Sequence, residues 1–149
     1  MIIAIDFDGT ISRGEYPAID GEQPYAGEVI RKLHNDGHYI IIWTCRCGDK
    51  LLSAINWLIE HKIPFDRIND HNPDNVAKYG EGGRKVFADV YIDDRNIGGF
   101  PGWATCEEMI AKMIEDSPVN QIKPIETPEH ITLLELSYKK FIDNVLPRT

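Results

Sequence analysis

Five polar residues of this sequence lie at, or just past, the ends of short apolar runs: Asp6, Asp8, Thr44, Asp93 and Asp94. In parallel α/β sheets, ligands bind beyond the carboxyl ends of the strands, so these side chains are the first candidates for chemistry. Four carboxylates at one edge would repel one another unless a cation lay between them, and hard oxygen ligands suit Mg²⁺. The set therefore predicts a magnesium site, although each aspartate taken singly is also typical of a turn or a cap.

Four apolar runs predict the strands that must position these residues. Ile2–Ile5 and Tyr39–Trp43 are rich in isoleucine and too short for helices, which is typical of strands buried on both faces. Phe65–Ile68 and Ala88–Ile92 predict a third and a fourth strand. The candidate residues would then lie at the carboxyl ends of the first, second and fourth strands.

Apolar residues at helical spacing separate the predicted strands. The first helix is expected between Pro24 and Gly37, where the glycine suits a left-handed C-terminal cap. The second helix has Asp49 as its expected N-cap. Its predicted apolar face consists of Leu51, Leu52, Ile55, Leu58 and Ile59.

A third helix is predicted to open at a capping box, Thr105 and Glu108, and to run to about residue 115. Strands that alternate with helices indicate a parallel sheet covered on both faces. We therefore expect residues 1–116 to form a single three-layer, Rossmann-like α/β domain. At 149 residues, the chain is long enough for one such core and short for two.

The last part of the chain is predicted to lie outside this core. Residues 117–128 contain three prolines and are expected to form an extended connector. Residues 129–146 are expected to form a terminal helix with an apolar seam of Ile131, Leu134, Tyr138, Phe141 and Val145. This helix would pack on the chain's own core or form the contact of a homodimer.

Composition narrows the classes of partner and location. A formal charge of −8 disfavours nucleic acid, because a phosphate backbone repels an acidic protein. The first residues include no basic segment or apolar run long enough for a signal peptide or a membrane span. Three cysteines without a framework spacing suit the cytoplasm, and Cys45-Arg46-Cys47 lacks the second ligand pair that zinc would need.

Several motifs together resemble those of the haloacid dehalogenase-like superfamily. Asp6-Phe7-Asp8-Gly9-Thr10 is similar to its D-x-D-G-T signature at the end of the first strand. Thr44 resembles the hydroxyl residue of its second motif, Lys85 the lysine of its third, and Asp93-Asp94 the acidic fourth. The four occur in the family's order over roughly residues 1–105, with Lys78 as the alternative to Lys85. Their joint order is more specific than any of them alone.

The resemblance implies a magnesium-dependent phosphatase acting on a phosphorylated substrate. Asp6 would attack phosphorus and form an aspartyl-phosphate, and Asp8 would act as general acid and then as general base. Thr44 and Lys85 would bind the transferring phosphoryl group. The resemblance implies Mg²⁺ ligands on the Asp6 carboxylate, the Asp8 backbone carbonyl and one or both of Asp93 and Asp94.

Substrate binding is assigned to the neighbourhood of these motifs. Gly9 and Thr10 belong to it through the signature. Arg46, beside Thr44, is a candidate for holding an anionic group and equally a candidate for a surface salt bridge. The gaps of 33 residues from Thr10 to Thr44 and 40 from Thr44 to Lys85 leave no room for a large cap domain. We expect only a small flap at residues 11–21.

A different class of function stays open, namely a signalling or binding module without catalysis. Receiver domains also gather acidic residues, a threonine and a lysine around Mg²⁺, but they place the phosphoacceptor on a middle strand after an initial acidic pair. A catalytically silent relative of the phosphatases is the other version of this alternative. A P-loop nucleotide site is disfavoured because the chain has no G-x-x-x-x-G-K-[ST] pattern.

Overall fold

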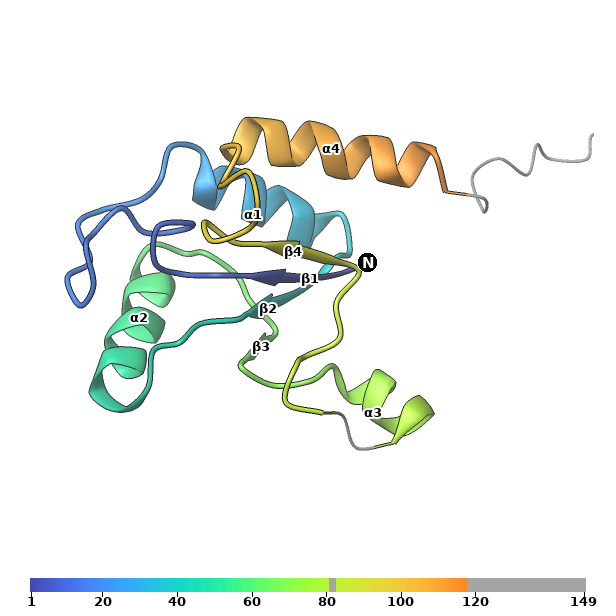
Figure 1. Ribbon diagram of the computed structural model, residues 1–149, viewed down its shortest axis with the longest axis horizontal. Helices are drawn as coiled ribbons and strands as arrows, with labels where there is room; N and C mark the ends of the chain where they lie inside the picture. The colour runs from blue at the N-terminus through green and yellow to red at the C-terminus, as the bar shows by residue number, and fades with distance from the viewer. Residues whose placement is uncertain (81–82, 118–149) are drawn as a thin grey trace, which may run out of the picture. The chain divides into compact units, whose positions relative to one another are not determined.

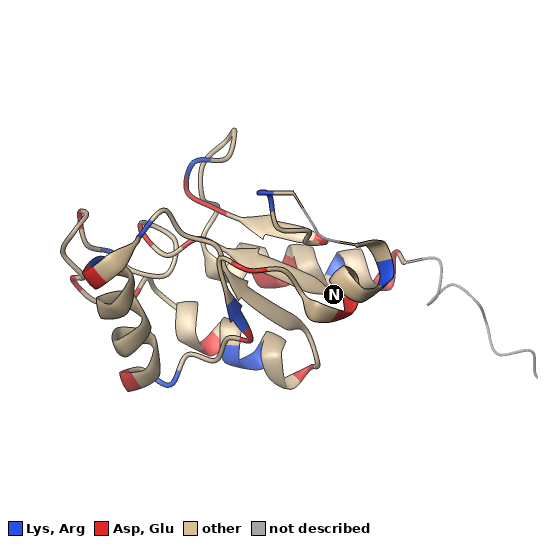
Figure 2. Cartoon of the chain, turned by 90° about the horizontal axis from the view of Figure 1, so that it is seen from below, with Lys and Arg blue, Asp and Glu red and all other residues tan. Residues whose placement is uncertain are grey.

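The computed structural model of the protein describes residues 1–80 and 83–117. The chain divides into two compact units, Met1–Ala111 and Lys112–Thr149. Apart from Ser117, the predicted connector (117–128) and the predicted terminal helix (129–146) lie outside the described residues. No helix in the described part is both long and apolar enough to cross a membrane. Acidic and basic residues are interspersed along the described chain (Figure 2).

Four strands form one parallel sheet in the order β3-β2-β1-β4 (Figure 1). They are β1 (Ile2–Ile5), β2 (Tyr39–Ile42), β3 (Arg67–Ile68) and β4 (Val90–Ile92). The order places β1, the strand that leads to Asp6, between β2 and β4. The predicted α/β fold is therefore confirmed.

The third and fourth strands are shorter than predicted because aspartate side chains take over the pairing at their starts. The Asp66 carboxylate accepts the backbone N–H of Ile40 at 2.7 Å, so β3 begins only at Arg67. In the same way the Asp89 carboxylate accepts the N–H of Ile2 at 2.7 Å, just before β4.

The helices lie on both sides of the sheet. Within the first unit, α1 (Ala26–Asn35) and the start of α4 (Trp103–Glu115) lie on one side, and α2 (Gly48–Glu60) lies on the other (Figure 1). A short helix, α3 (Pro73–Tyr79), was not predicted. Gly37 has a φ of 85° after α1, as its predicted capping position requires.

Two predicted helix starts are wrong. Cys47 is the N-cap of α2 and makes no side-chain capping bond, while Asp49 lies in the first turn. The helix α4 begins at Trp103, so Thr105 and Glu108 lie inside it and do not cap it. Gly102, with a φ of 91°, reverses the chain directly before the buried Trp103 and thereby sets the start of α4.

The apolar face of α2 is also narrower than predicted. Leu58 is fully buried and Ala54 is 1% exposed, but Leu52 and Ile59 are exposed. The predicted arc of five residues is wider than the stripe that packs on the rest of the molecule.

The sheet is apolar on both faces. Paired positions alternate, so Ile5 and its partners Ile42 and Ile92 point to one face and are nearly fully buried. Ala4 and Ile41 point to the other, where they pack with Val86 and Ala88. Side chains buried on both faces hold β1 rigidly in the middle of the sheet.

Trp103 connects α4 to the loop that follows β1. Its indole is 1% exposed, and Nε1 donates a hydrogen bond of 2.8 Å to the backbone oxygen of Thr10. Since Thr10 belongs to the D-x-D-G-T segment, this bond joins the far end of the chain's core to the candidate site.

We predict that Trp103→Phe lowers the free energy of unfolding by about 1–3 kcal/mol, because a buried carbonyl oxygen loses its donor and the smaller ring leaves a void. Urea denaturation measures the change. The exposed Met109→Leu on the same helix is the control and should stay within about 0.5 kcal/mol of the unsubstituted protein. Equal stability of both variants would contradict the role given to the indole.

Candidate functional site

The pairing of β1 with β4 brings the first and fourth acidic motifs together. Ile5 is aligned with Ile92, and the N–H of Asp6 donates to the oxygen of Ile92 at 2.9 Å. As a result, one carboxylate oxygen from each of Asp6, Asp93 and Asp94 lies within 4.8 Å of the other two. We call these three residues the carboxylate triad.

Two residues of the loop after β1, Gly9 and Thr10, contact the triad. Gly9 has a φ of 81°, and a Cβ there would lie 2.6 Å from Oδ2 of Asp94, so only glycine fits against that carboxylate. The fully buried Thr10 accepts the N–H of Asp94 at 3.0 Å, and its hydroxyl donates to Asp6 over a longer 3.5 Å. Both predicted residues therefore support the triad.

The triad is electrostatically strained. Burial is the largest influence on Asp6 and raises its pKa from 3.8 to about 7, against the lowering effect of a backbone hydrogen bond from Phe7. The neighbouring charges of Asp93, Asp94 and Asp8 add to the rise. The pKa of Asp94 is raised as well, first by burial and then by the charge of Asp93.

A divalent cation fits this arrangement. Oxygens on opposite sides of a Mg²⁺ ion are about 4 Å apart, which is compatible with three oxygens that all lie within 4.8 Å of one another. The donors are hard carboxylate oxygens, and the charges of Asp93, Asp94 and Asp8 add to the effect of burial on the pKa of Asp6. A cation between them would remove the repulsion.

Asp8 lies beside the triad but is paired with a protein cation. Both of its carboxylate oxygens accept from Arg46, Oδ1 from Nη2 at 2.7 Å and Oδ2 from Nε at 2.9 Å. Arg46 therefore forms a salt bridge, as one of its two predicted roles has it, but at 2% exposed this salt bridge is buried and not at the surface. The guanidinium is a buried partner of Asp8 and has a two-pronged geometry that fixes that carboxylate in place.

Thr44 is 8% exposed, and its hydroxyl accepts the N–H of Arg46 at 3.1 Å. Its backbone is held on both sides by the Asn69 side chain, which accepts the Thr44 N–H and donates to the Thr44 oxygen, both at 2.8 Å. The sequence analysis did not single out Asn69. The amide thus fixes the end of β2 at the site.

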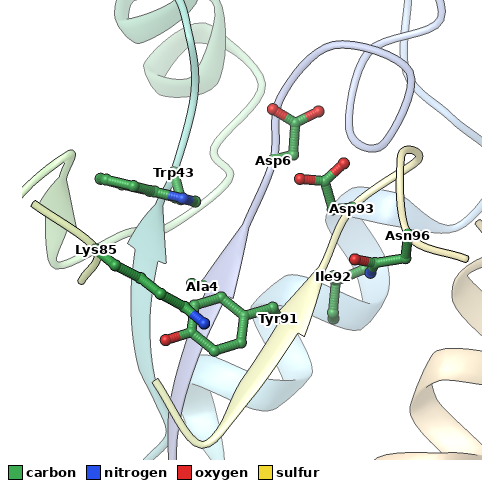
Figure 3. A pocket seen from close by; sticks show the side chains of 8 residues that line it. All are labelled: Ala4, Asp6, Trp43, Lys85, Tyr91, Ile92, Asp93 and Asn96. Atoms are coloured by element: carbon green, nitrogen blue, oxygen red, sulfur yellow. The ribbon is translucent and has the colours of Figure 1, made fainter. Parts of the chain in front are cut away.

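Lys85 lines a pocket of about 290 Å³ that also contains Asp6 and Asp93 (Figure 3). We call it the sheet pocket, because Ala4 on β1 and Tyr91 on β4 contribute to its wall. The Lys85 ammonium lies 4.6 Å from the centre of the Tyr91 ring. The alternative, Lys78, belongs to α3 and lies over the ring of Tyr79.

A second pocket of about 290 Å³ lies beside the triad and is lined by Asp8 and by Tyr16 of the flap. We call it the flap pocket. Both pockets share Asp6 and Asp93, but only the sheet pocket has Lys85 and only the flap pocket has Asp8 among its lining residues. Tyr16 was not predicted as a site residue, since nothing in the irregular flap sequence marks it.

The fold and the site define an α/β protein of the Rossmann-like class with an acidic centre at the carboxyl edge of a parallel sheet. The chain is similar to a solved structure described as a conserved protein from Bacteroides thetaiotaomicron, with 37% sequence identity and a TM-score of 0.68. The match covers 83% of this chain and 98% of that one. The chain belongs to the family of that conserved protein, whose description names no activity.

No family model matches the chain, and no curated protein matches it either.

The strain on Asp6 leads to a stability prediction. The pKa of Asp6 is about 7 in the folded chain and 3.8 ordinarily. At a pH between these two values, Asp6 is therefore protonated in the folded state and ionised in the unfolded state. Stability from this group is therefore present below about pH 4 and is lost as the pH rises through 7. At pH 8 without divalent metal, the free energy of unfolding of Asp6→Asn should be about 1–3 kcal/mol higher than that of the unsubstituted protein, so the variant should be the more stable of the two.

The difference should shrink towards pH 5 and also shrink when Mg²⁺ is added, since the cation stabilises only the chain that binds it. Thermal or urea unfolding at the two pH values, with and without metal, measures both effects. If Asp6→Asn is less stable at pH 8 without metal, the carboxylates do not strain one another as described.

Proposed function

We propose that the protein is a magnesium-dependent phosphatase of the haloacid dehalogenase-like type, which hydrolyses a phosphate monoester through an aspartyl-phosphate on Asp6. The observation that carries this proposal is the carboxylate triad, in which Asp6 lies beside Asp93 and Asp94 at the edge of the sheet. The order of the sequence motifs supports it independently.

The carboxylates of Asp6, Asp93 and Asp94, together with the backbone carbonyl of Asp8, would hold the metal ion. When bound, Mg²⁺ neutralises negative charge on the phosphoryl group and on the carboxylates, so that two anions can approach each other. The raised pKa of Asp6 supports this assignment, because a nucleophile with a pKa of about 7 needs a nearby cation to stay ionised during turnover.

The first half of the reaction breaks the ester bond. The ionised Asp6 attacks phosphorus, the bond from phosphorus to the alcohol oxygen breaks, and that oxygen takes a proton as the alcohol leaves. Asp8 supplies this proton as general acid. In the second half, Asp8 takes a proton from a water molecule that attacks phosphorus, which releases phosphate and restores Asp6.

The contacts of Asp8 fix the position of the carboxyl group that would carry this proton. Arg46 binds both oxygens of the carboxylate and fixes its orientation beside the triad. Asp8 and Asp6 line the same pocket, so an alcohol oxygen bound there can contact Asp8 while phosphorus contacts Asp6. In this proposal Asp8 would exchange its proton on the flap side of the triad.

Lys85 and Thr44, which do not line the flap pocket, would bind the phosphoryl oxygens. Lys85 lines the sheet pocket together with Asp6 and offers a positive charge to a bound phosphate. The Thr44 hydroxyl, at the end of β2, would donate to a phosphoryl oxygen while it accepts the N–H of Arg46. The proposed location is the cytoplasm, which suits a chain whose three cysteines are free thiols.

We predict that the protein hydrolyses acetyl phosphate and 4-nitrophenyl phosphate with Mg²⁺, and that Asp6→Asn lowers kcat by at least about a thousandfold, because the nucleophile is lost. Release of inorganic phosphate is the measurement, and an excess of chelator should abolish it. The exposed Asp49→Asn is the matched control and should keep full activity. If Asp6→Asn turned over as fast as the unsubstituted protein, Asp6 would not be the nucleophile.

A separate prediction concerns Asp8. Asp8→Asn should slow hydrolysis of an alkyl phosphate about ten times or more beyond its effect on 4-nitrophenyl phosphate, because nitrophenolate leaves without a proton and an alkoxide does not. Values of kcat for both substrates give the ratio. Equal slowing of both would mean that Asp8 does not protonate the leaving oxygen.

A further inference from the structure

The flap pocket is where the alcohol part of a substrate must lie if the proposed function holds. Asp8 lines this pocket and is not among the lining residues of the sheet pocket, so the oxygen that Asp8 protonates lies on the flap side. Whatever is bonded to that oxygen then lies in a pocket whose wall, besides the triad and Asp8, consists of Tyr16, Cys45 and Arg95. This step rests on the proposed function.

Tyr16 is the exposed aromatic residue in the wall of this pocket. Its side chain is large and yet 58% exposed, although it belongs to the pocket wall. The guanidinium carbon of Arg46 lies 5.3 Å from the centre of the Tyr16 ring, which is a cation–π contact. This contact covers one face of the ring. The remaining surface of the ring is available to a ligand.

Arg46 fixes this ring relative to Asp8. Its Nη2 donates to the backbone oxygens of Pro17 at 3.2 Å and Ala18 at 3.4 Å, and also to Asp8. Its Nη1 donates to the oxygen of Lys50, and the Phe7 ring lies 5.0 Å from the guanidinium carbon. One buried cation thus holds the flap next to Tyr16, the acid Asp8 and the start of α2.

We propose that Tyr16 is the specificity-determining contact of the leaving group, and that the site favours phosphate monoesters whose alcohol carries a planar, unsaturated ring. Such a ring stacks on the open face of Tyr16, while its phosphate stays on Asp6. A ring held by its guanidinium contact loses little freedom on binding, so the stacking contributes to affinity nearly in full. Arg46 is the positioning residue for this contact, because it acts on the substrate only through Asp8 and Tyr16.

The test compares two esters that differ only in the character of the ring. In 2-phenylethyl phosphate and 2-cyclohexylethyl phosphate the phosphate is bonded to the same kind of primary alcohol, so the need for protonation is the same. We expect kcat/KM to favour the phenyl compound about three- to tenfold, the usual strength of an aromatic pair. A pocket that binds the ring by hydrophobic burial alone would favour the cyclohexyl compound, which has the larger apolar surface.

Three variants assign the preference to a residue. Tyr16→Phe should keep it, whereas Tyr16→Leu and Tyr16→Ala should bring the ratio of the two kcat/KM values to about 1 or below, because the aromatic face is gone. Tyr79→Ala, which removes another exposed tyrosine outside both pockets, is the control and should leave the ratio unchanged. An unchanged preference in Tyr16→Leu, or no preference in the unsubstituted protein, would overturn the inference.

Binding of the corresponding phosphonates separates this inference from the proposed function. They cannot be hydrolysed, so calorimetry with Mg²⁺ reports the ring preference whether or not the protein turns over esters. A phenyl preference that depends on Tyr16, found together with no phosphate release from acetyl phosphate, 4-nitrophenyl phosphate or 2-phenylethyl phosphate, would refute the phosphatase and keep the ring site. Turnover of acetyl phosphate without any ring preference would do the reverse.

Discussion

The repulsion among three carboxylates at the carboxyl edge of the sheet is the constraint on which the site depends. It follows from the fold, because the parallel register that aligns Ile5 with Ile92 forces the next residues of both strands together. Hydrophobic packing on both faces of the sheet supplies the free energy that holds Asp6 in this position. The chain therefore maintains an unfavourable cluster in its folded state, which is the usual condition of a functional site whose ligand is a cation.

The acidic residues of the site are balanced in two different ways. Asp8 has a protein partner, the buried Arg46, which occupies both of its oxygens. Among the described residues, no arginine or lysine forms such an ion pair with the carboxylates of the triad, and burial together with the neighbouring negative charges raises the pKa of Asp6. The segment after β1 thus carries one aspartate with a buried counter-charge and another without a side-chain cation among the described residues. This difference agrees with the different roles that the proposed function gives to the two carboxylates.

Local sequence patterns predict most of the strands and helices, but they predict fewer of the side-chain contacts at the site. The strands β1 and β2 are isoleucine runs whose burial on both faces leaves little alternative, and the order of motifs was enough to predict that Asp6 and Asp93 meet. The helix α3 was missed although Asn72 and Pro73 carry an N-cap and a first-turn signal, because seven residues give too little periodicity. The start of α4 was misplaced because a buried tryptophan, not the local capping pattern, decides it.

Long-range contacts account for what the sequence left open. Arg46 had two interpretations, and only the fold shows that it is buried against Asp8, 38 residues earlier in the chain. The same guanidinium donates to the backbone oxygens of Pro17 and Ala18, which follow Tyr16, the flap residue in the wall of the flap pocket. Because Asp8 and Tyr16 share one anchor, the positions of the carboxylate and of the aromatic ring are coupled through Arg46. If the proposed function holds, this coupling is what would bring the leaving oxygen of a ring-bearing substrate to Asp8.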